Sequence, residues 1–227
     1  MGKDKLIRWE ENKTFEHVFE PSLHEIAKGA TFQQGKWREN VFHNDNPIVL
    51  ELGCGKGEYT VGLAKLFPEK NFIGVDIKGH RFWRGAKSSK EEGLKNVAFL
   101  RARIEMIERF FGPNEVDEIW LTFSDPQLKD RREKKRLSGP GFVKKYRQFC
   151  KPGSILHLKT DNTFLYEWTL EQNEEFGVEV LNHTSDVYGD YFEQLDELDR
   201  KVMGIRTYYE MKFVEQGEKI KYIKSRL

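Results

Sequence analysis

Short apolar runs alternate with longer amphipathic stretches along most of the chain. The apolar run at residues 47–52 is followed by glycines and predicts a buried strand. Residues 58–67 then have helical spacing. The pairing recurs, with strands predicted at 71–77, 97–100, 116–123, 154–160 and 178–182 and helices at 78–92, 104–111, 141–150 and 162–176. Repeated strand–helix units predict an α/β, Rossmann-like fold, in which a mostly parallel sheet of about seven strands carries helices on both faces.

The C-terminal part of the chain has a weaker pattern. Residues 207–216 have helical spacing, and residues 219–223 alternate in the manner of an edge strand. A chain of 227 residues is long enough for one α/β domain, and no Pro- or Ser-rich linker divides it. We therefore expect residues 46–227 to form a single domain, preceded by an N-terminal extension, residues 1–45, that can be flexible.

Composition narrows the class of protein. No apolar run approaches the roughly 20 residues that a membrane-spanning helix needs, and the polar residues 1–11 lack a signal-peptide core. Cys54 and Cys150 are too few for a disulfide framework or a metal cluster, and the six histidines have no ligand spacing. The expectation is a soluble cytoplasmic protein, a monomer or a homodimer, with reduced thiols, no metal and no membrane partner.

The charges are segregated along the chain, although 38 basic and 37 acidic residues give a net charge of only +1. Residues 160–199 contain twelve acids and no Lys or Arg, whereas residues 129–151 contain ten basic residues and two acids. Such asymmetry indicates a basic face that fits a polyanion such as a nucleic acid, and a solvated charged loop is the alternative.

A glycine-rich turn follows the first predicted strand of the domain. It reads Glu51-Leu52-Gly53-Cys54-Gly55-Lys56-Gly57, and alternate glycines let the backbone turn tightly and approach a ligand closely. Asp76 ends the second strand, 25 residues after Glu51, where a carboxylate can accept hydrogen bonds from a ribose diol. A plain strand-to-helix turn is the alternative, but the pair favours a nucleoside-containing cofactor.

The spacing of the glycines and the charge of Glu51 select among such cofactors. A dinucleotide site would use Gly-x-Gly-x-x-Gly, and a carboxylate at Glu51 would repel the pyrophosphate. S-adenosylmethionine fits better, because it carries an ammonium and a sulfonium and has no phosphate. The motif resembles the first motif of class I methyltransferases.

The acceptor is indicated by Ser124-Asp125-Pro126-Gln127, which follows the strand predicted at 116–123. Enzymes that methylate exocyclic amines often carry a second proline and an aromatic residue here, and this chain has neither. Guanine N7 has a lone pair and no proton, so its methylation requires alignment and stabilisation of a cationic ring and no strong base. Asp125 is the candidate catalytic carboxylate.

Four segments together resemble the tRNA (guanine-N7-)-methyltransferase family, whose product lies in the variable loop of tRNA. They are Phe123–Lys129, Arg131–Arg136, Lys159–Asn162 and Thr207–Glu210, in the family's order. The resemblance implies that S-adenosylmethionine is bound by Glu51, Gly53, Gly55, Asp76, Arg103 and Asp125. It also implies that tRNA is contacted by Lys129, Arg131, Arg132, Lys134, Lys135, Arg136, Asp161, Thr207, Tyr208, Tyr209 and Glu210.

The chain departs from the family's pattern at three places, one of which is Asp130 in place of a usual basic residue. Gln127-Leu128 stands where the family usually has an aromatic residue after Asp-Pro, so the sequence predicts no aromatic surface for the guanine at this position. Arg103 stands where an Asp or Asn is common near the adenine. Because an arginine side chain cannot accept a hydrogen bond, only the backbone amide of Arg103 can serve there.

Simpler roles are open for two of these residues. The sole role of Asp161 could be to cap the helix that begins at Asn162. Glu210 could be a solvent-facing helical residue. The function predicted as a whole is transfer of a methyl group from S-adenosylmethionine to guanine N7 in tRNA. The alternatives are a methyltransferase acting on another RNA or a small molecule, and a non-catalytic RNA-binding protein.

Overall fold

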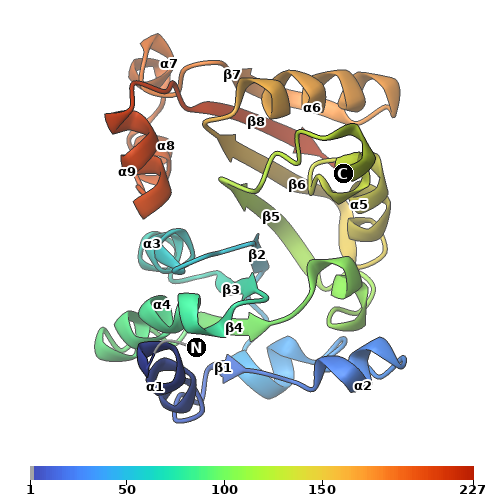
Figure 1. Cartoon of the computed structure of the whole chain (residues 1–227), viewed down its shortest axis with the longest axis vertical. Helices are drawn as coiled ribbons and strands as arrows, with labels where there is room; N and C mark the ends of the chain where they lie inside the picture. Colours follow the sequence, from blue (N-terminus) through green and yellow to red (C-terminus); the bar gives the residue numbers. More distant parts are fainter. Residues whose placement is uncertain (1–2) are drawn as a thin grey trace.

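An eight-stranded sheet forms the centre of the protein, for which a computed structural model describes residues 3–227 (Figure 1). The strands are β1 (Val18–Phe19), β2 (Ile48–Leu52), β3 (Asn71–Asp76), β4 (Val97–Arg101), β5 (Val116–Thr122), β6 (Cys150–Thr160), β7 (Glu179–Thr184) and β8 (Lys221–Arg226). Their order is β1-β4-β3-β2-β5-β6-β8-β7, parallel from β1 to β6, with β8 antiparallel to both β6 and β7. This confirms the predicted mostly parallel, Rossmann-like sheet.

Helices cover both faces of the sheet. The α-helices are α1 (Lys3–Asn12), α2 (Leu23–Ala27), α3 (Glu58–Leu66), α4 (Gly79–Glu91), α5 (Pro140–Tyr146), α6 (Thr163–Glu175), α7 (Asp190–Gln194), α8 (Glu197–Met203) and α9 (Tyr208–Glu215). A π-helical turn η1 (Arg38–Phe42) and the 3₁₀ helices η2 (Ile104–Arg109) and η3 (Asp130–Lys135) complete the helical segments. Helices α3 and α4 lie on one side of the sheet, and α5 and α6 lie on the other (Figure 1).

The core has two layers because successive residues of a strand point to opposite faces. In β2, Ile48, Leu50 and Leu52 pack into the layer beneath α5 and α6, whereas Val49 packs into the layer beneath α3 and α4. All five residues of β2 are buried, as expected for a central parallel strand. This rigid centre fixes the loops that follow the strands.

The chain's last strand was predicted at the edge of the sheet, and that prediction was wrong. Strand β8 lies between β6 and β7, and Tyr222 and Ile223 are buried on its two faces. The predicted helix at 104–111 is a shorter 3₁₀ segment with a break at Met106. Helix α7 lies within the acidic stretch and α8 begins in it, and no apolar period indicated either helix.

The residues before β2 pack against the rest of the protein. Strand β1 pairs with β4, and the Asn12 side-chain amide on α1 donates to the carbonyl oxygen of Gly79 at 3.0 Å. Trp37 is fully buried, and its indole N–H donates to the carbonyl oxygen of Phe110 at 2.7 Å. In this structure the predicted N-terminal extension therefore contributes a strand to the sheet and a helix that packs on α4.

Candidate active site

The glycine-rich turn after β2 leaves open space in front of its backbone. Gly53 and Gly55 have φ values of +82° and +56°, a left-handed conformation that disfavours residues with a Cβ. A Cβ placed on either residue would meet no atom within 4 Å. The glycines thus satisfy the turn, and the open side gives a ligand access to the backbone.

Asp76, at the end of β3, is oriented by this turn. Its carboxylate accepts the backbone N–H of Gly55 at 3.1 Å and that of Lys78 at 2.8 Å. The carboxylate lies in a cavity of about 420 Å³, which is also lined by Gly53, Ile77, Ala102, Arg103, Ile104, Glu105, Asp125, Gln127, Lys135, Leu137 and Phe142. A cavity of this size that combines apolar side chains with carboxylates has the chemistry for a nucleoside.

A second cavity of about 430 Å³ adjoins the first. Gly53, Asp125 and Leu137 line both cavities. The second cavity is further lined by Cys54, Gly55, Lys56, Glu58, Arg81, Thr122, Phe123, Ser124, Pro126, Asp161, Thr207, Tyr209 and Phe213. Asp125 therefore stands where a ligand of the first cavity would meet a ligand of the second.

The loop that carries Asp125 has a constrained backbone. One carboxylate oxygen of Asp125 accepts the backbone N–H of Gln127 at 3.0 Å, while the side chain remains exposed. Phe123 and Gln127 have φ values of +51° and +48°, a strained conformation for residues other than glycine. Such strain persists only where surrounding contacts hold the loop in place.

Arg136 supplies those contacts. Its guanidinium donates to the carbonyl oxygens of Pro126 and Gln127, at 3.2 Å in each case. It lies 4.8 Å from the ring centre of Phe164 and 4.5 Å from that of Trp168. Only 2% of Arg136 is exposed, so its side chain supports the Asp125 loop from inside the protein. In this structure it does not reach the solvent, where the predicted contact with RNA would be made.

Glu51 is buried behind the glycine-rich turn and lines neither cavity among the described residues. Its carboxylate accepts the backbone N–H of Thr60 at 2.8 Å and the hydroxyl of Thr122 at 2.5 Å. Burial raises the pKa of Glu51 from 4.5 to about 7, against these hydrogen bonds. In this structure Glu51 joins β2, α3 and β5 and reaches a ligand only through the turn that it supports.

This raised pKa predicts a pH-dependent stability. The folded protein holds the Glu51 proton more tightly than the unfolded chain, so stability falls as pH rises from 4.5 through about 7. The full penalty above that range is on the order of 3 kcal/mol. Glu51→Gln does not titrate, so its free energy of unfolding should improve relative to the parent protein as pH rises from 4 to 8. Denaturant titrations across this range test the point, and a pH-independent difference would contradict it.

The segment from Thr207 to Glu210 forms part of the second cavity and begins α9. The Thr207 hydroxyl accepts the backbone N–H of Glu210 at 3.1 Å, and the backbone N–H of Tyr208 donates to Glu58 at 2.8 Å. Glu210 is fully buried and forms an ion pair with Lys159 at 2.8 Å. The alternative of a solvent-facing Glu210 was therefore wrong.

Asp161 lies at the end of β6 and lines the second cavity. The cap of α6 is Asn162, whose side-chain oxygen accepts the backbone N–H of Leu165 at 2.8 Å. The alternative that Asp161 serves only as this cap was wrong. Partial burial raises the pKa of the Asp161 carboxyl, and the side chain is available to a ligand.

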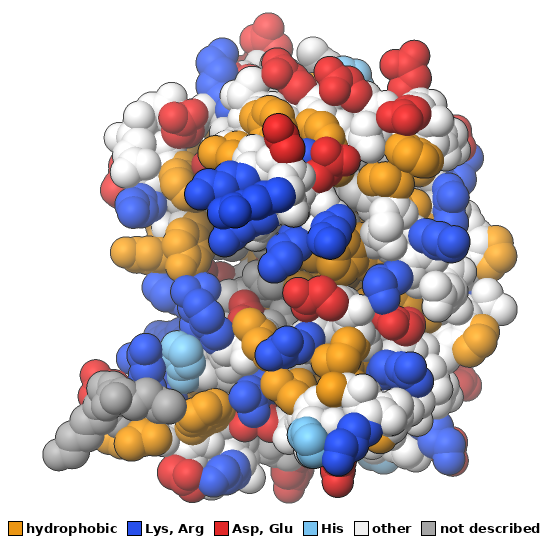
Figure 2. Space-filling model, turned by 45° about the vertical axis from the view of Figure 1, so that its right-hand side comes forward, with side chains coloured by type: hydrophobic (Ala, Val, Ile, Leu, Met, Phe, Trp, Pro, Cys, Tyr) orange, Lys and Arg blue, Asp and Glu red, His pale blue; other side chains and the backbone are white. Residues whose placement is uncertain are grey.

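An exposed basic strip follows the Asp125 loop. It comprises Lys129, Arg131, Arg132, Lys134 and Lys135, all exposed on or beside η3. Figure 2 shows Lys and Arg side chains gathered on both sides of a hollow in this face of the molecule. A phosphate backbone could follow such a surface beside the two cavities.

Comparisons with known proteins agree with this arrangement. A family model described as "Putative methyltransferase" matches residues 45–223. A tRNA (guanine-N(7)-)-methyltransferase of Christiangramia forsetii is 50% identical over 226 residues, which cover 100% of this chain and 99% of that one. One from Bacteroides fragilis is 49% identical, covering 99% of this chain and 86% of that one.

The chain belongs to the tRNA (guanine-N(7)-)-methyltransferase family. Among solved structures, the 16S rRNA methyltransferase KamB superposes with a TM-score of 0.62 at 15% identity, covering 86% of this chain and 94% of that one. At this identity the likeness concerns the fold alone, and it confirms the class I methyltransferase architecture.

The structure offers aromatic side chains in place of the one that this family member lacks after Asp-Pro. Leu128 has no aromatic ring, and 59% of it is exposed to solvent. Phe123, Tyr209 and Phe213 line the second cavity instead, and the rings of Phe123 and Phe213 stack with centres 6.2 Å apart. Of these, Phe123 and Phe213 were not among the predicted site residues, although Phe213 follows Tyr209 by one helical turn.

Arg136→Ala should impair catalysis through the loop that carries Asp125. The change frees the carbonyl oxygens of Pro126 and Gln127 and lets the strained loop relax. Because a displacement of about 1 Å can cost 10²-fold, we expect kcat to fall about 10- to 100-fold. Arg136→Lys should restore little, since an ammonium cannot donate in the same fork between two rings. Arg147→Ala, at an exposed arginine that follows α5 and lines neither cavity, is the matched control. Equal kcat values for the two alanine variants would contradict the bracing role.

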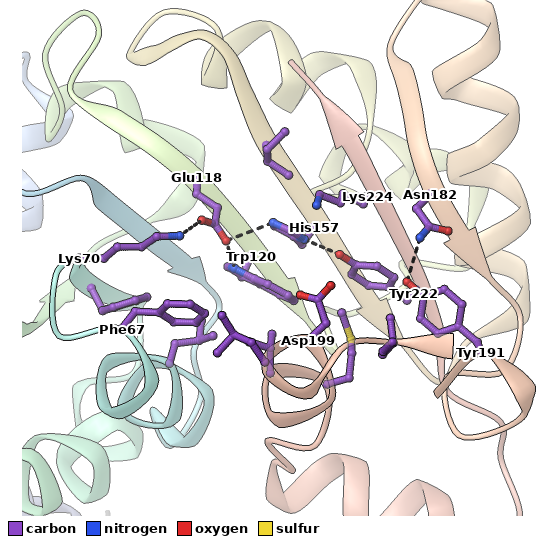
Figure 3. Close-up of a pocket in the computed structure, with 17 residues that line it drawn as sticks. Phe67, Lys70, Glu118, Trp120, His157, Asn182, Tyr191, Asp199, Tyr222 and Lys224 are labelled. Atoms are coloured by element: carbon purple, nitrogen blue, oxygen red, sulfur yellow. Dashed lines mark hydrogen bonds and ion pairs between the residues drawn. The ribbon is translucent and has the colours of Figure 1, made fainter. Parts of the chain in front are cut away.

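A separate cavity of about 360 Å³ lies on the sheet face beneath α7 and α8 (Figure 3). Glu118 accepts hydrogen bonds from Trp120 at 2.6 Å and Lys70 at 3.0 Å, and lies 3.1 Å from His157. His157 is in turn 2.7 Å from the Tyr222 hydroxyl. These polar groups already form hydrogen bonds or ion pairs with one another, so we assign the network a structural role that connects β5, β6 and β8.

No group of three or more His, Cys, Asp or Glu side chains within residues 3–227 is arranged to hold a metal ion. No helix in the same range is long and apolar enough to cross a membrane.

Proposed function

We propose that this protein transfers the methyl group of S-adenosylmethionine to N7 of a guanine in the variable loop of tRNA. The observation that carries the residue assignment is the position of Asp125 at the junction of two cavities. One cavity fits the nucleoside of the cofactor, and the other opens toward exposed basic side chains. An enzyme acting on tRNA is expected in the cytoplasm.

The first cavity holds the adenosine part of the cofactor. The Asp76 carboxylate accepts hydrogen bonds from the ribose diol, and the backbone at Gly53 and Gly55 lies against the methionine part. Arg103 contributes its backbone amide near the adenine. When bound, S-adenosylmethionine supplies an electrophilic methyl group on its sulfonium.

The second cavity receives the target guanine. Tyr209 and Phe213 offer ring faces for stacking, and Asp161 and Thr207 offer polar atoms to the base edge. Asp125 accepts hydrogen bonds from the guanine's Watson–Crick edge, which aligns N7 and stabilises the positive charge that develops on the ring. No proton has to be removed at N7, so Asp125 acts as a positioning and electrostatic group and not as a strong base.

The surface around this cavity holds the tRNA backbone. The basic strip supplies five exposed cations next to Asp125, which suits phosphate oxygens. Tyr208 is 47% exposed and lies beneath the Lys56 ammonium, 3.6 Å from the ring centre, at the rim of the same cavity. Glu210 supports this rim through Lys159 and contacts the tRNA only indirectly.

A substrate altered at one atom tests the assigned acceptor. In a tRNA transcript whose variable-loop guanine is replaced by 7-deazaguanine, N7 becomes a C–H group and has no lone pair. Methyl transfer to this transcript should fall to background, while its affinity for the protein stays close to that of the normal transcript. Undiminished transfer would show that another atom is the acceptor.

A further inference from the structure

A second basic groove lies on the other side of the glycine-rich turn. It has a volume of about 600 Å³ and runs between α1 and the first half of α4. Its lining contains Lys5, Arg8, Lys56, Arg81, Arg84 and His80, together with Trp83 and the acids Asp4 and Glu58. We call it the α1–α4 groove.

The five Lys and Arg side chains of this groove outnumber its two acids. Among the described residues, none of its five Lys and Arg side chains forms an ion pair, and Glu58 is occupied by the backbone N–H of Tyr208. The pKa of His80 is lowered, first by partial burial and then by Lys5, Arg81, Lys78 and Arg8. The groove therefore has a positive electrostatic potential that would attract an anion.

The groove is a built feature of the fold. Helix α1 is fixed on α4 by Glu11, which accepts hydrogen bonds from Trp83 at 2.7 Å and Lys87 at 2.9 Å. The guanidinium of Arg8 lies 4.9 Å from the ring centre of Trp83. Glu11 is thus paired with α4 and Glu10 with Lys13, and among the described residues Lys5 and Arg84 form no ion pair.

The groove is continuous with the proposed guanine site. Lys56, Glu58 and Arg81 line both the groove and the second cavity. Basic side chains thus occur on two sides of the hollow in Figure 2, the strip beside Asp125 and the groove beyond the glycine-rich turn. A polyanion whose base enters the second cavity would extend its backbone in both directions.

We infer that the α1–α4 groove is a second phosphate-binding surface for the tRNA, on the far side of the target guanine from the basic strip. This inference rests on the proposed function, because it takes tRNA as the polyanion. Two flanking contacts would hold the nucleotide chain across the cavity and fix the base at Asp125. Each phosphate contact releases counterions, so the groove also predicts part of the salt dependence of binding.

The test compares two variants that each remove two positive charges. Lys5→Ala/Arg84→Ala removes charges from the groove, and Lys90→Ala/Lys95→Ala removes exposed charges near the other end of α4. Binding to unmodified tRNA is measured from 50 to 300 mM salt, after thermal unfolding has confirmed that both variants are folded. The groove variant should bind about tenfold more weakly near 150 mM salt, with a log–log salt slope shallower by about 1 to 2, whereas the control should match the parent protein.

The inference and the proposed function can fail separately. If the parent protein methylates tRNA but the groove and control variants bind alike, the groove is not a tRNA surface. If the parent protein binds tRNA in a groove-dependent way but forms no 7-methylguanosine, the surface stands and the proposed reaction fails. A parent protein that neither binds nor methylates tRNA would overturn both.

Discussion

Asp125→Asn should lower methyl transfer by about 10² to 10³-fold, and Asp125→Ala by at least as much. The asparagine keeps an oxygen that can accept the backbone N–H of Gln127, so the turn is preserved while the negative charge is lost. That charge is expected to face the cationic ring that forms as N7 accepts the methyl group. The loss should therefore appear in kcat, measured as initial rates at saturating tRNA and cofactor.

A matched control separates this effect from a general loss of acidic charge. Asp130 is an exposed acid in the same loop region, within the basic strip, and Asp130→Asn should leave kcat close to the parent value. Calorimetry with S-adenosylmethionine should give nearly the parent affinity for Asp125→Asn. Normal turnover by this variant would remove Asp125 from the catalytic role.

Glu210→Ala should destabilise the protein by about 3 to 5 kcal/mol, because it leaves the buried Lys159 ammonium without its partner. Both side chains are fully buried, and Lys159 also donates to the carbonyl oxygens of Met203 at 2.7 Å and Ile205 at 3.3 Å. The ion pair thus holds the end of α8 and the start of α9 against β6. Burial lowers the pKa of Lys159, which agrees with an ammonium that depends on Glu210.

A double-mutant cycle measures this pair. Replacing both partners in Lys159→Met/Glu210→Leu should cost less than the sum of the two single changes, since no unpaired charge remains. Glu215→Ala, at an exposed position of the same helix, should change the free energy of unfolding by less than about 0.5 kcal/mol. Denaturant titrations supply all values. A Glu210→Ala variant as stable as Glu215→Ala would mean that Glu210 acts elsewhere, such as on the guanine directly.

Sequence patterns located the central strands because burial leaves a simple signature in them. Strands β2 to β5 and the second half of β6 are apolar runs bounded by turns. The carboxylates at or after the strand ends, Asp76, Asp125 and Asp161, do meet at one edge of the sheet. This follows from parallel pairing, which aligns the carboxyl ends of the strands. The shared location of these three carboxylates was therefore predictable from the sequence, whereas the shape of the cavities was not.

Other features depend on contacts between distant segments. The interior position of β8 results from pairing with β6 and β7, which a strand of six residues does not encode alone. Arg136 belongs to a run of basic residues in the sequence, yet it turns inward because Phe164 and Trp168 offer ring faces and the Asp125 loop offers carbonyl oxygens. Glu210 is likewise buried by a lysine 51 positions earlier, Lys159.

Product analysis tests the central claim most directly. The protein is incubated with unmodified tRNA and methyl-labelled S-adenosylmethionine, and the tRNA is digested to nucleosides and separated. We predict that the label appears in 7-methylguanosine and that Asp125→Asn yields almost none. Label in another nucleoside, or no label in tRNA from a protein that binds the cofactor, would contradict the account.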